Sequence, residues 1–386
     1  MEKESERMKI VADENIPYVK EAFGHIGEVR TMSGRSLSSE ALRDADVLLV
    51  RSITKVNEML LEGSSVRFVG TATIGVDHID MEYLEEHTIE FSSAQGSNAN
   101  SVAEYIVAAL LELSDRYHFA LSGKTLGVIG AGNIGSIVAR YATALGLKVL
   151  ENDPPLARET GDPRYLPLDA LFDADILTLH VPLNREGEDR TYHLTDREFF
   201  SKMKPGGIFI NTSRGQVVET EALKGALKHE HLGAAVIDVW EHEPTIDTAL
   251  LEKVAIATPH IAGYSRDGKA NGTQMMYDAV CEHFNIQPEW NVQSALPQVS
   301  DATLAITGDS DENMLRDAVR KAYPIMKDDA GLRNVLTRET TERGPYFDRL
   351  RKEYPVRREF YNYTLLCKHA AESLTIKARA IGFKLA

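Results

Sequence analysis

The sequence predicts an α/β protein built on a Rossmann-type, doubly wound parallel sheet. Short apolar runs alternate with amphipathic segments along most of the chain, which is typical of parallel strands covered by helices on both faces. A glycine-rich turn, Gly130–Gly135, directly follows one apolar run and begins a helical pattern. The length of 386 residues also suffices for more than one domain, at roughly 150 residues each.

The first hundred residues form one α/β series. Apolar runs predict buried strands at Lys9–Asp13, Asp46–Ser52, Val66–Thr73 and Ile89–Ala94. The segments between them predict helices at Pro17–His25, Ser38–Arg43, Glu58–Leu61 and Met81–His87.

A long helical pattern, Ser101–Leu121, precedes a second series that begins at Lys124. The strands expected there are Leu126–Gly130, Lys148–Asp153, Asp175–Val181, Gly207–Ser213, Ala234–Trp240 and Val254–His260. A helix is expected at Gly272–Phe284, and Gln287-Pro288 is typical of a linker.

The last hundred residues differ from the rest in charge. The chain as a whole has a formal net charge of −15, with −17 in residues 1–287 and +2 in residues 288–386. This change predicts a separate C-terminal module. It is expected to contain a strand at Thr303–Thr307, a helix at Asp311–Ala322 and a basic stretch from Arg343 to Arg358.

Composition excludes several classes of protein. A chain this acidic suits neither nucleic acid nor an anionic membrane surface, and no apolar run approaches the roughly 18 residues of a membrane span. The charged N-terminus lacks the apolar core of a signal peptide, so we expect a cytoplasmic protein. Cys281 and Cys367 show no metal-ligand spacing, and no metal is expected.

The glycine-rich turn predicts a dinucleotide site. Gly130 permits the tight turn, Gly132 lets the backbone approach a pyrophosphate, and Gly135 allows close packing of helix on strand. The motif is completed by Asn133 and Ile134 at the start of the helix, whose free N–H groups favour an anion. Asp153 ends the next strand, 18 residues after Gly135, where a carboxylate can bind a ribose and repels a 2′-phosphate. NAD is therefore favoured over NADP.

Polar residues also end later strands of the second series. They are Arg214, then Asp238 followed by Glu243, and then His260. Because ligands of parallel sheets bind at the carboxyl ends of the strands, we expect these groups to converge.

Three of these groups, Arg214, Glu243 and His260, match the needs of hydride transfer from a secondary alcohol. His260 can accept the hydroxyl proton, Arg214 can hold an anionic substrate, and Glu243 can bind the other imidazole nitrogen. Taken singly, each also has a structural explanation, as a buried histidine, a helix cap or a residue of a solvated loop.

The motifs GAGNIG with Asp153, NTSRGQVV, DVWEHEP and TPHIAGY, in this order, resemble the D-isomer-specific 2-hydroxyacid dehydrogenases. The segments MKIVADENIPY, VRSITKVNEMLL, FVGTATIGVDHID and FDRLRKEYPVRREF resemble one branch of that family. That branch oxidises 4-phospho-D-erythronate to (R)-3-hydroxy-2-oxo-4-phosphooxybutanoate in pyridoxal 5′-phosphate biosynthesis.

The resemblance implies three domains. Residues 1–98, with part of 261–287, would form a flavodoxin-like α/β lid domain, and residues 99–260 the NAD-binding Rossmann domain. Residues 288–386 would form a small α+β domain through which two copies of the chain make a homodimer.

The resemblance also implies site residues. Arg214, Glu243 and His260 would be catalytic, and Ser52, Thr73 and Tyr264 would contact the substrate. Beyond the glycine motif, the implied cofactor contacts are Asp153, Val181, Thr212, Ser213, Arg214, Asp238 and Gly263. Val181 has no side-chain hydroxyl, so a contact there would use its backbone.

A phosphorylated hydroxy acid carries about three negative charges. Arg214 is expected at its carboxylate and Arg51, next to Ser52, at its phosphate, with Arg35 or Lys55 as alternatives. The basic stretch 343–358 is another candidate, with a solvated helix face as its plainer interpretation.

Two other functions stay open at this point. The chain could oxidise another D-2-hydroxy acid such as 3-phosphoglycerate, or it could be a non-catalytic, NAD-sensing protein of the corepressor kind.

Overall fold

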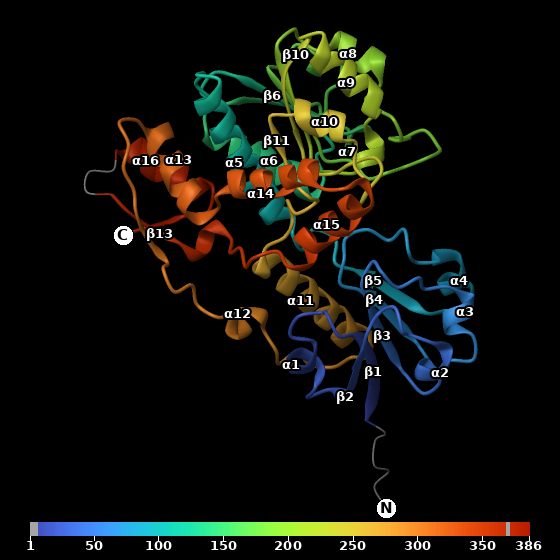
Figure 1. Cartoon of the computed structure of the whole chain (residues 1–386). Coiled ribbons are helices and arrows are strands. Elements are labelled where there is room, and N and C mark those ends of the chain that lie inside the picture. The colour runs from blue at the N-terminus through green and yellow to red at the C-terminus, as the bar shows by residue number, and fades with distance from the viewer. Residues whose placement is uncertain (1–6, 368–370) are drawn as a thin grey trace, which may run out of the picture. The chain divides into compact units, whose positions relative to one another are not determined.

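The computed structural model describes residues 7–367 and 371–386, and its chain divides into two compact units (Figure 1). Unit 1 contains the chain through Asn98 together with Ser265–Gln298. Unit 2 contains Ala99–Tyr264 and Val299–Ala386. Both are parallel sheets covered by helices, so the predicted α/β class is confirmed.

Unit 1 holds a five-stranded parallel sheet in the order β2-β1-β3-β4-β5, the flavodoxin-like order. Its strands are β1 (Met8–Asp13), β2 (Gly27–Met32), β3 (Val47–Val50), β4 (Phe68–Thr71) and β5 (Glu90–Ser93). The sequence did not predict β2. This edge strand is only partly covered, so it carries Glu28 and Arg30 and lacks an apolar run.

The helices of unit 1 cover both faces of this sheet. They are α1 (Val19–Phe23), α2 (Ser39–Leu42), α3 (Glu58–Leu61), α4 (Met81–Glu86), α11 (Arg266–His283) and α12 (Val292–Ala295). Successive residues of a strand point to opposite faces. Ile10 accordingly packs with α1 and α11, whereas Val11 packs with α2, α3 and α4. Helix α11 begins six residues before the predicted Gly272, because Ser265 caps a polar first turn that shows no apolar pattern.

Unit 2 holds a six-stranded parallel sheet in the order β11-β10-β9-β8-β6-β7. Its strands are β6 (Thr125–Ile129), β7 (Lys148–Asn152), β8 (Ile176–Leu179), β9 (Gly207–Asn211), β10 (Leu232–Ile237) and β11 (Ile256–Ala257). The strand order reverses at β6, which has β7 on one side and β8 on the other. In open sheets of this kind, ligands bind beside the carboxyl ends of the strands at such a reversal.

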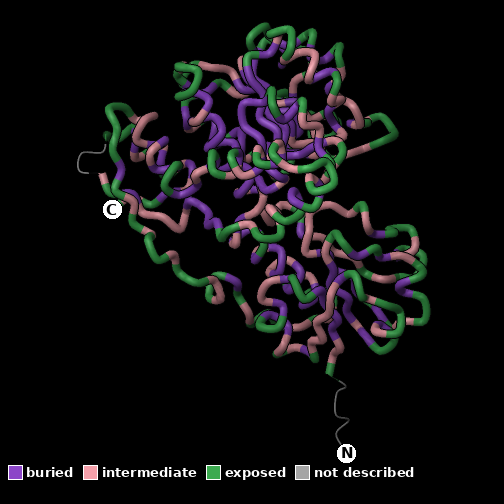
Figure 2. Tube along the Cα trace, viewed as in Figure 1, coloured by how far each residue is buried: buried purple, intermediate pink, exposed green. Residues whose placement is uncertain are grey.

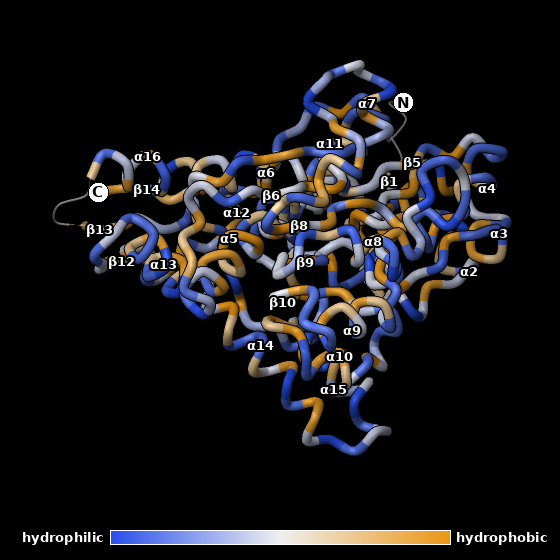
Figure 3. The backbone as a smooth tube through the Cα atoms, turned by 90° about the horizontal axis from the view of Figure 1, so that it is seen from above, coloured by the Kyte–Doolittle hydropathy of each residue, from blue (hydrophilic) through white to orange (hydrophobic). Residues whose placement is uncertain are grey.

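Two helical layers cover the sheet of unit 2. The elements between its strands and before them are α5 (Ala99–Arg116), α6 (Asn133–Ala144), α7 (Pro154–Thr160), η1 (Leu168–Leu171), α8 (Arg197–Lys202), η2 (Gly215–Val217), α9 (Thr220–Lys228) and α10 (Thr248–Lys253). Ile208 and Ile210 pack with α5 and α6, whereas Phe209 packs with α8, α9 and α10. Figure 2 shows these strands and α5 buried, and Figure 3 shows the apolar residues that run along them. Helix α5 ends before the predicted Leu121, because His118 has a left-handed φ of 53°.

The C-terminal residues of unit 2 form a small three-stranded sheet in the order β12-β13-β14. Its elements are β12 (Thr303–Ala305), α13 (Asp311–Ala322), α14 (Ile325–Arg333), η3 (Asn334–Thr337), α15 (Thr340–Lys352), η4 (Phe360–Asn362), β13 (Thr364–Leu366), α16 (Glu372–Ala380) and β14 (Lys384–Leu385). Of its strands, the sequence predicted β12 alone and missed β13 and β14. The division into three domains stays a prediction, since residues 299–386 cluster in the same unit as the Rossmann sheet.

None of the described helices is long and apolar enough to cross a membrane. Among the same residues, no group of His, Cys, Asp and Glu side chains is arranged to hold a metal ion.

Candidate active site

The glycine-rich turn joins β6 to α6 at the reversal of the strand order. Gly130 has a φ of +89°, and a Cβ there would lie 2.6 Å from the carbonyl oxygen of His180. A Cβ on Gly135 would lie 1.9 Å from the carbonyl oxygen of Gly130. A Cβ on Gly132, by contrast, would meet no atom within 4 Å. The turn is therefore closed on its protein side and has room for a ligand at Gly132, directly before Asn133 and Ile134.

Asp153 connects this turn to the end of β7. Its Oδ2 accepts a hydrogen bond from the Ala131 N–H at 2.8 Å, and its Oδ1 caps α7 through the Leu156 N–H at 3.1 Å. Arg158, the first basic residue after Asp153, forms ion pairs with Asp189 and Glu188. The environment of Asp153 thus favours a ribose with a free 2′-hydroxyl over one with a 2′-phosphate.

The turn after β9 carries Thr212, Ser213 and Arg214. Asn211 orders it, because its Oδ1 accepts from the Ser213 N–H at 3.0 Å and its Nδ2 donates to the Arg214 carbonyl at 3.0 Å. The hydroxyl oxygen of Thr212 is buried and has no hydrogen-bond partner within the described chain. A buried polar atom of this kind fits a place where a bound molecule supplies the partner. Together with the open space at Gly132, it supports the fit of a dinucleotide at this edge.

Val181 and Gly263 are also placed at this edge of unit 2. Val181 follows β8, and its Cγ1 would lie 2.9 Å from a Cβ at Gly130, so its side chain packs beneath the glycine turn. Gly263 is half-buried and lies three residues after His260.

Asp238 holds the loop that carries His260. It is 1% exposed, and its carboxylate accepts from the Thr258 hydroxyl at 2.6 Å, the Ile261 N–H at 2.8 Å and the Ala262 N–H at 3.0 Å. Burial raises the pKa of this carboxyl. The sequence assigned Asp238 to the cofactor, whereas the contacts within the chain engage both of its oxygens in ordering residues 258–262.

Glu243 and His260 form a hydrogen-bonded pair. The Nδ1 atom of His260 lies 2.7 Å from Oε2 of Glu243, and Oε1 of Glu243 accepts from the Trp240 N–H at 2.8 Å. With Glu243 ionised, the proton of the neutral imidazole is on Nδ1, and Nε2 can accept a proton from another molecule. His260 itself has a left-handed φ of 57°, and its side chain is 33% exposed. The sequence predicted this pair, and the structure brings its two members together.

The pKa of Glu243 is lowered. Burial alone would raise it, but the charge and hydrogen bond of His260, the Trp240 N–H and the charge of Arg351 together outweigh burial. Glu243 is therefore a carboxylate at neutral pH, which is the form that stabilises a protonated imidazole.

Arg214 lies beside the loop that leads to Glu243. The next residue, Gly215, approaches the Trp240 carbonyl so closely that a Cβ would lie 1.9 Å from its oxygen. The guanidinium of Arg214 donates to the Ser213 carbonyl at 2.9 Å and is partly exposed. It keeps further N–H donors that a carboxylate can use.

The expected substrate contacts divide between the units. Ser52, Thr73 and Arg51 belong to unit 1, where they follow the adjacent strands β3 and β4. The hydroxyl oxygen of Thr73 lies 2.8 Å from that of Thr71. Ser52 is exposed and Arg51 is partly buried, whereas Arg35 and Lys55 are both exposed. Tyr264 belongs to unit 2, four residues after His260.

Sequence reasoning missed residues that support this site from a distance along the chain. The Thr258 hydroxyl donates to Asp238, and the hydroxyl oxygen of Tyr105 lies 2.8 Å from that of Thr258. Arg357 donates to the Ala262 carbonyl at 3.0 Å. A basic stretch was visible around Arg357, but a run of charges does not indicate which of its members turns inward.

Comparisons with known proteins agree with this geometry. Residues 100–262 match the family model of the D-isomer specific 2-hydroxyacid dehydrogenase NAD binding domain, and residues 295–382 match a domain of unknown function, DUF3410. The chain is 46% identical to the erythronate-4-phosphate dehydrogenase of Salinibacter ruber, over 93% of this chain and 94% of that protein. It is 44% identical to the enzyme of the same name from Cellvibrio japonicus, over 98% of this chain and 100% of that protein.

Solved structures share the fold over a smaller part of the chain. The D-lactate dehydrogenase of Aquifex aeolicus, complexed with NAD and lactic acid, has a TM-score of 0.57 and 27% identity. It covers 72% of this chain and 96% of its own. An NAD-dependent formate dehydrogenase from Staphylococcus aureus, in complex with NAD, has a TM-score of 0.58 and 25% identity, over 74% of this chain and 98% of its own.

Proposed function

This chain belongs to the erythronate-4-phosphate dehydrogenase family, and we propose that it catalyses the NAD-dependent oxidation of 4-phospho-D-erythronate to (R)-3-hydroxy-2-oxo-4-phosphooxybutanoate in pyridoxal 5′-phosphate biosynthesis. The observation that carries the proposal is the Glu243–His260 pair, which lies in the same unit as a glycine turn with room for a dinucleotide. Identity over nearly the whole chain favours this reaction over oxidation of another hydroxy acid and over a non-catalytic NAD sensor.

The residues that would hold NAD are the turn Gly130–Gly135, Asp153, Val181, Thr212–Arg214, Asp238 and Gly263. Bound NAD supplies the acceptor for the hydride that leaves C2 of the substrate. Gly132 leaves space for the pyrophosphate, and Asp153 accepts hydrogen bonds from the ribose. Thr212 offers a buried hydroxyl, and Val181 would contact NAD through its backbone. Asp238 orders the loop of residues 258–262.

The chemistry on the substrate falls to three side chains. Nε2 of His260 accepts the proton of the C2 hydroxyl, and the Glu243 carboxylate stabilises the resulting imidazolium. Arg214 binds the substrate carboxylate and orients the oxygen that becomes the carbonyl. Ser52, Thr73 and Tyr264 contact the substrate, and the candidates for its phosphate are Arg51 and the basic stretch 343–358.

The substitution His260→Ala tests the mechanism. Loss of the base should lower kcat by about 10²- to 10⁴-fold, with little change in NAD affinity. NADH formation measures the first quantity and NAD titration the second. Near-normal turnover would remove His260 from the catalytic role.

Comparison of substrates tests the reaction itself. The wild-type protein should oxidise 4-phospho-D-erythronate much faster than D-erythronate or 3-phospho-D-glycerate. Equal rates on all three would contradict the proposed specificity.

The homodimer and the cytoplasmic location belong to the same proposal. In the C-terminal residues, Met326, Val356, Leu366 and Ile376 are large apolar side chains that are exposed in the single chain. Apolar side chains of this kind are typical of surfaces that another subunit covers. Light scattering should give twice the mass of 42.8 kDa, and Leu366→Glu with Ile376→Glu should lower that mass to one chain. An unchanged mass in the double variant would place the interface elsewhere.

A further inference from the structure

Helix α15 runs along the loops that carry the catalytic pair. Gly344 faces the loop after Glu243, since a Cβ there would lie 3.6 Å from Pro244 and 3.5 Å from the hydroxyl of Thr245. Arg351 follows Gly344 by seven residues, which is two helical turns, so both residues lie on the same face of the helix. The face of α15 that contains Arg351 therefore adjoins the catalytic loops.

Arg351 contacts the second loop as well. Its guanidinium carbon lies 5.8 Å from the ring centroid of Tyr264, and Tyr354 packs edge-on against the same ring at 5.9 Å. The Arg351 charge also acts on Glu243, where it contributes to the lowered pKa of that carboxyl. One cation thus lies near both Glu243 and the proposed substrate contact Tyr264.

The hydrogen-bonding capacity of Arg351 is not used up within the chain. Its Nε atom is buried and has no hydrogen-bond partner in the described residues. Arg343 of the same stretch donates its Nε to the carbonyl of Arg338, and Arg357 uses its Nη atoms on the carbonyls of Ala262 and Ser101. A guanidinium that keeps free donors beside a site for an anionic substrate can bind that substrate.

We propose that Arg351, supplied by the C-terminal module of the same chain, binds the phosphate of the substrate and so determines specificity for a phosphorylated hydroxy acid. This inference rests on the proposed function. The substrate has anionic groups at both ends, and Arg214 is assigned to the carboxylate. Arg351 gives the second end a planar fork of donors, which suits phosphate oxygens better than a single ammonium does.

The substitution Arg351→Gln removes the charge and leaves a shorter, neutral polar side chain. KM for 4-phospho-D-erythronate should rise by about 10- to 100-fold, the effect of losing charge-assisted hydrogen bonds. KM for D-erythronate, which lacks the phosphate, should stay the same. Arg351→Lys, with a charge but no fork, should give a smaller rise. Arg349→Gln, an exposed arginine on the same helix, is the matched control and should leave both KM values unchanged.

Binding without turnover gives a second measurement. In the His260→Ala background, calorimetric titration of 4-phospho-D-erythronate in the presence of NAD should show the same loss of affinity on adding Arg351→Gln. Circular dichroism checks that each variant is folded. If Arg351→Gln does not fold, Arg351→Lys decides the question by the same titration.

Each contrary result points to a different error. Unchanged KM and affinity in folded variants would overturn the role of Arg351 while the proposed function stands. A shift in the pH profile of kcat, equal for both substrates and without a change in KM, would make Arg351 a positioning residue for Glu243 instead. Equal wild-type rates on phosphorylated and phosphate-free substrates would overturn both the function and the phosphate site.

Discussion

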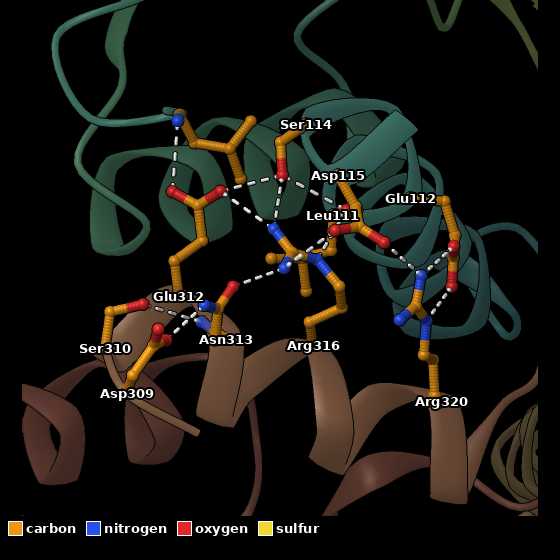
Figure 4. Close-up of polar contacts among 11 residues, drawn as sticks. Leu111, Glu112, Ser114, Asp115, Asp309, Ser310, Glu312, Asn313, Arg316 and Arg320 are labelled. Carbon is orange, nitrogen blue, oxygen red and sulfur yellow. Dashed lines mark hydrogen bonds and ion pairs between the residues drawn. The ribbon is translucent and has the colours of Figure 1, made fainter. Parts of the chain in front are cut away.

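Several contacts attach the C-terminal residues to the Rossmann part of unit 2, and two of them, at Arg320 and at Arg357, differ in burial. At the first, α13 lies along α5 and joins it by ion pairs near the surface (Figure 4). Arg320 donates to both carboxylate oxygens of Glu112, at 2.7 and 2.6 Å, and to Asp115 at 2.9 Å. The side chains of Arg320 and Asp115 are 44% and 47% exposed, whereas that of Glu112 is 13% exposed. Beside them, Arg316 reaches Ser114 and the Leu111 carbonyl.

At the second place, the connection is buried. Arg357 donates to the carbonyls of Ala262 and Ser101, at 3.0 and 2.6 Å, and its Nη2 lies 3.5 Å from Glu104. The side chains of Arg357 and Glu104 are 3% and 0% exposed. Glu104 also accepts from the Phe360 N–H at 2.6 Å.

The difference in burial predicts different effects of substitution at the two connections. Exposed ion pairs contribute little to stability, because water and salt screen them. A buried charge whose partner is removed is strongly destabilising, because it stays out of water without compensation. The buried connection also holds Ala262, two residues from His260. We therefore expect substitution of the half-exposed Arg320 to be tolerated and substitution of the buried Arg357 to affect both folding and catalysis.

The largest effect is expected from Arg357→Met. It removes the Arg357 charge from beside the buried Glu104 and breaks the buried hydrogen bonds of the guanidinium, so the free energy of unfolding should fall by about 3–5 kcal/mol. Release of the Ala262 carbonyl should also displace the His260 loop and lower kcat by about 10²-fold. Denaturant unfolding and steady-state rates measure the two effects. A loss of stability below about 1 kcal/mol would mean that the buried connection resembles the exposed one.

A smaller effect is expected when both charges are removed. In the double variant Glu104→Gln, Arg357→Met, no charge is left alone, and the Gln oxygen can still accept from the Phe360 N–H. The double variant should therefore be more stable than Arg357→Met alone, with a coupling energy of about 1–3 kcal/mol. Additive losses in this double-mutant cycle would show that the two side chains do not act on each other.

Much of the fold was predictable because local patterns determine it. Buried parallel strands such as β8 and β9 are continuous apolar runs, and the glycine turn fixes where β6 ends and α6 begins. The family and the NAD cofactor followed from these motifs and are confirmed by the comparisons. The edge strand β2 was missed because a partly covered edge strand carries polar residues and lacks an apolar run. The strands β13 and β14 were missed as well.

The candidate site was predictable where its residues directly follow predicted strands. Glu243 and His260 were paired from strand-end positions alone, and their hydrogen bond confirms that geometry. The roles of Arg351 and Arg357 were not predictable, because nearly a hundred residues separate them from the loops they contact. Which arginine of a basic stretch turns inward depends on tertiary packing, and no local spacing records it.

The smallest effect is expected from Arg320→Met, which matches the substitution at Arg357 in the exposed connection. The hydrogen bond from Arg320 lowers the pKa of Asp115, so some stabilisation exists. Arg320 and Asp115 are about half exposed, and Glu112, although 13% exposed, stays closer to water than the fully buried Glu104. The free energy of unfolding should fall by about 0.2–1 kcal/mol, and the difference from wild type should shrink as salt is raised from 0.1 M to about 1 M. The values of kcat and KM should not change, because no contact of Arg320 among the described residues reaches the loop of His260. A loss as large as that of Arg357→Met, or one that persists at high salt, would show that exposure does not separate the two connections. Their difference would then have to come from the number of hydrogen bonds that each arginine makes.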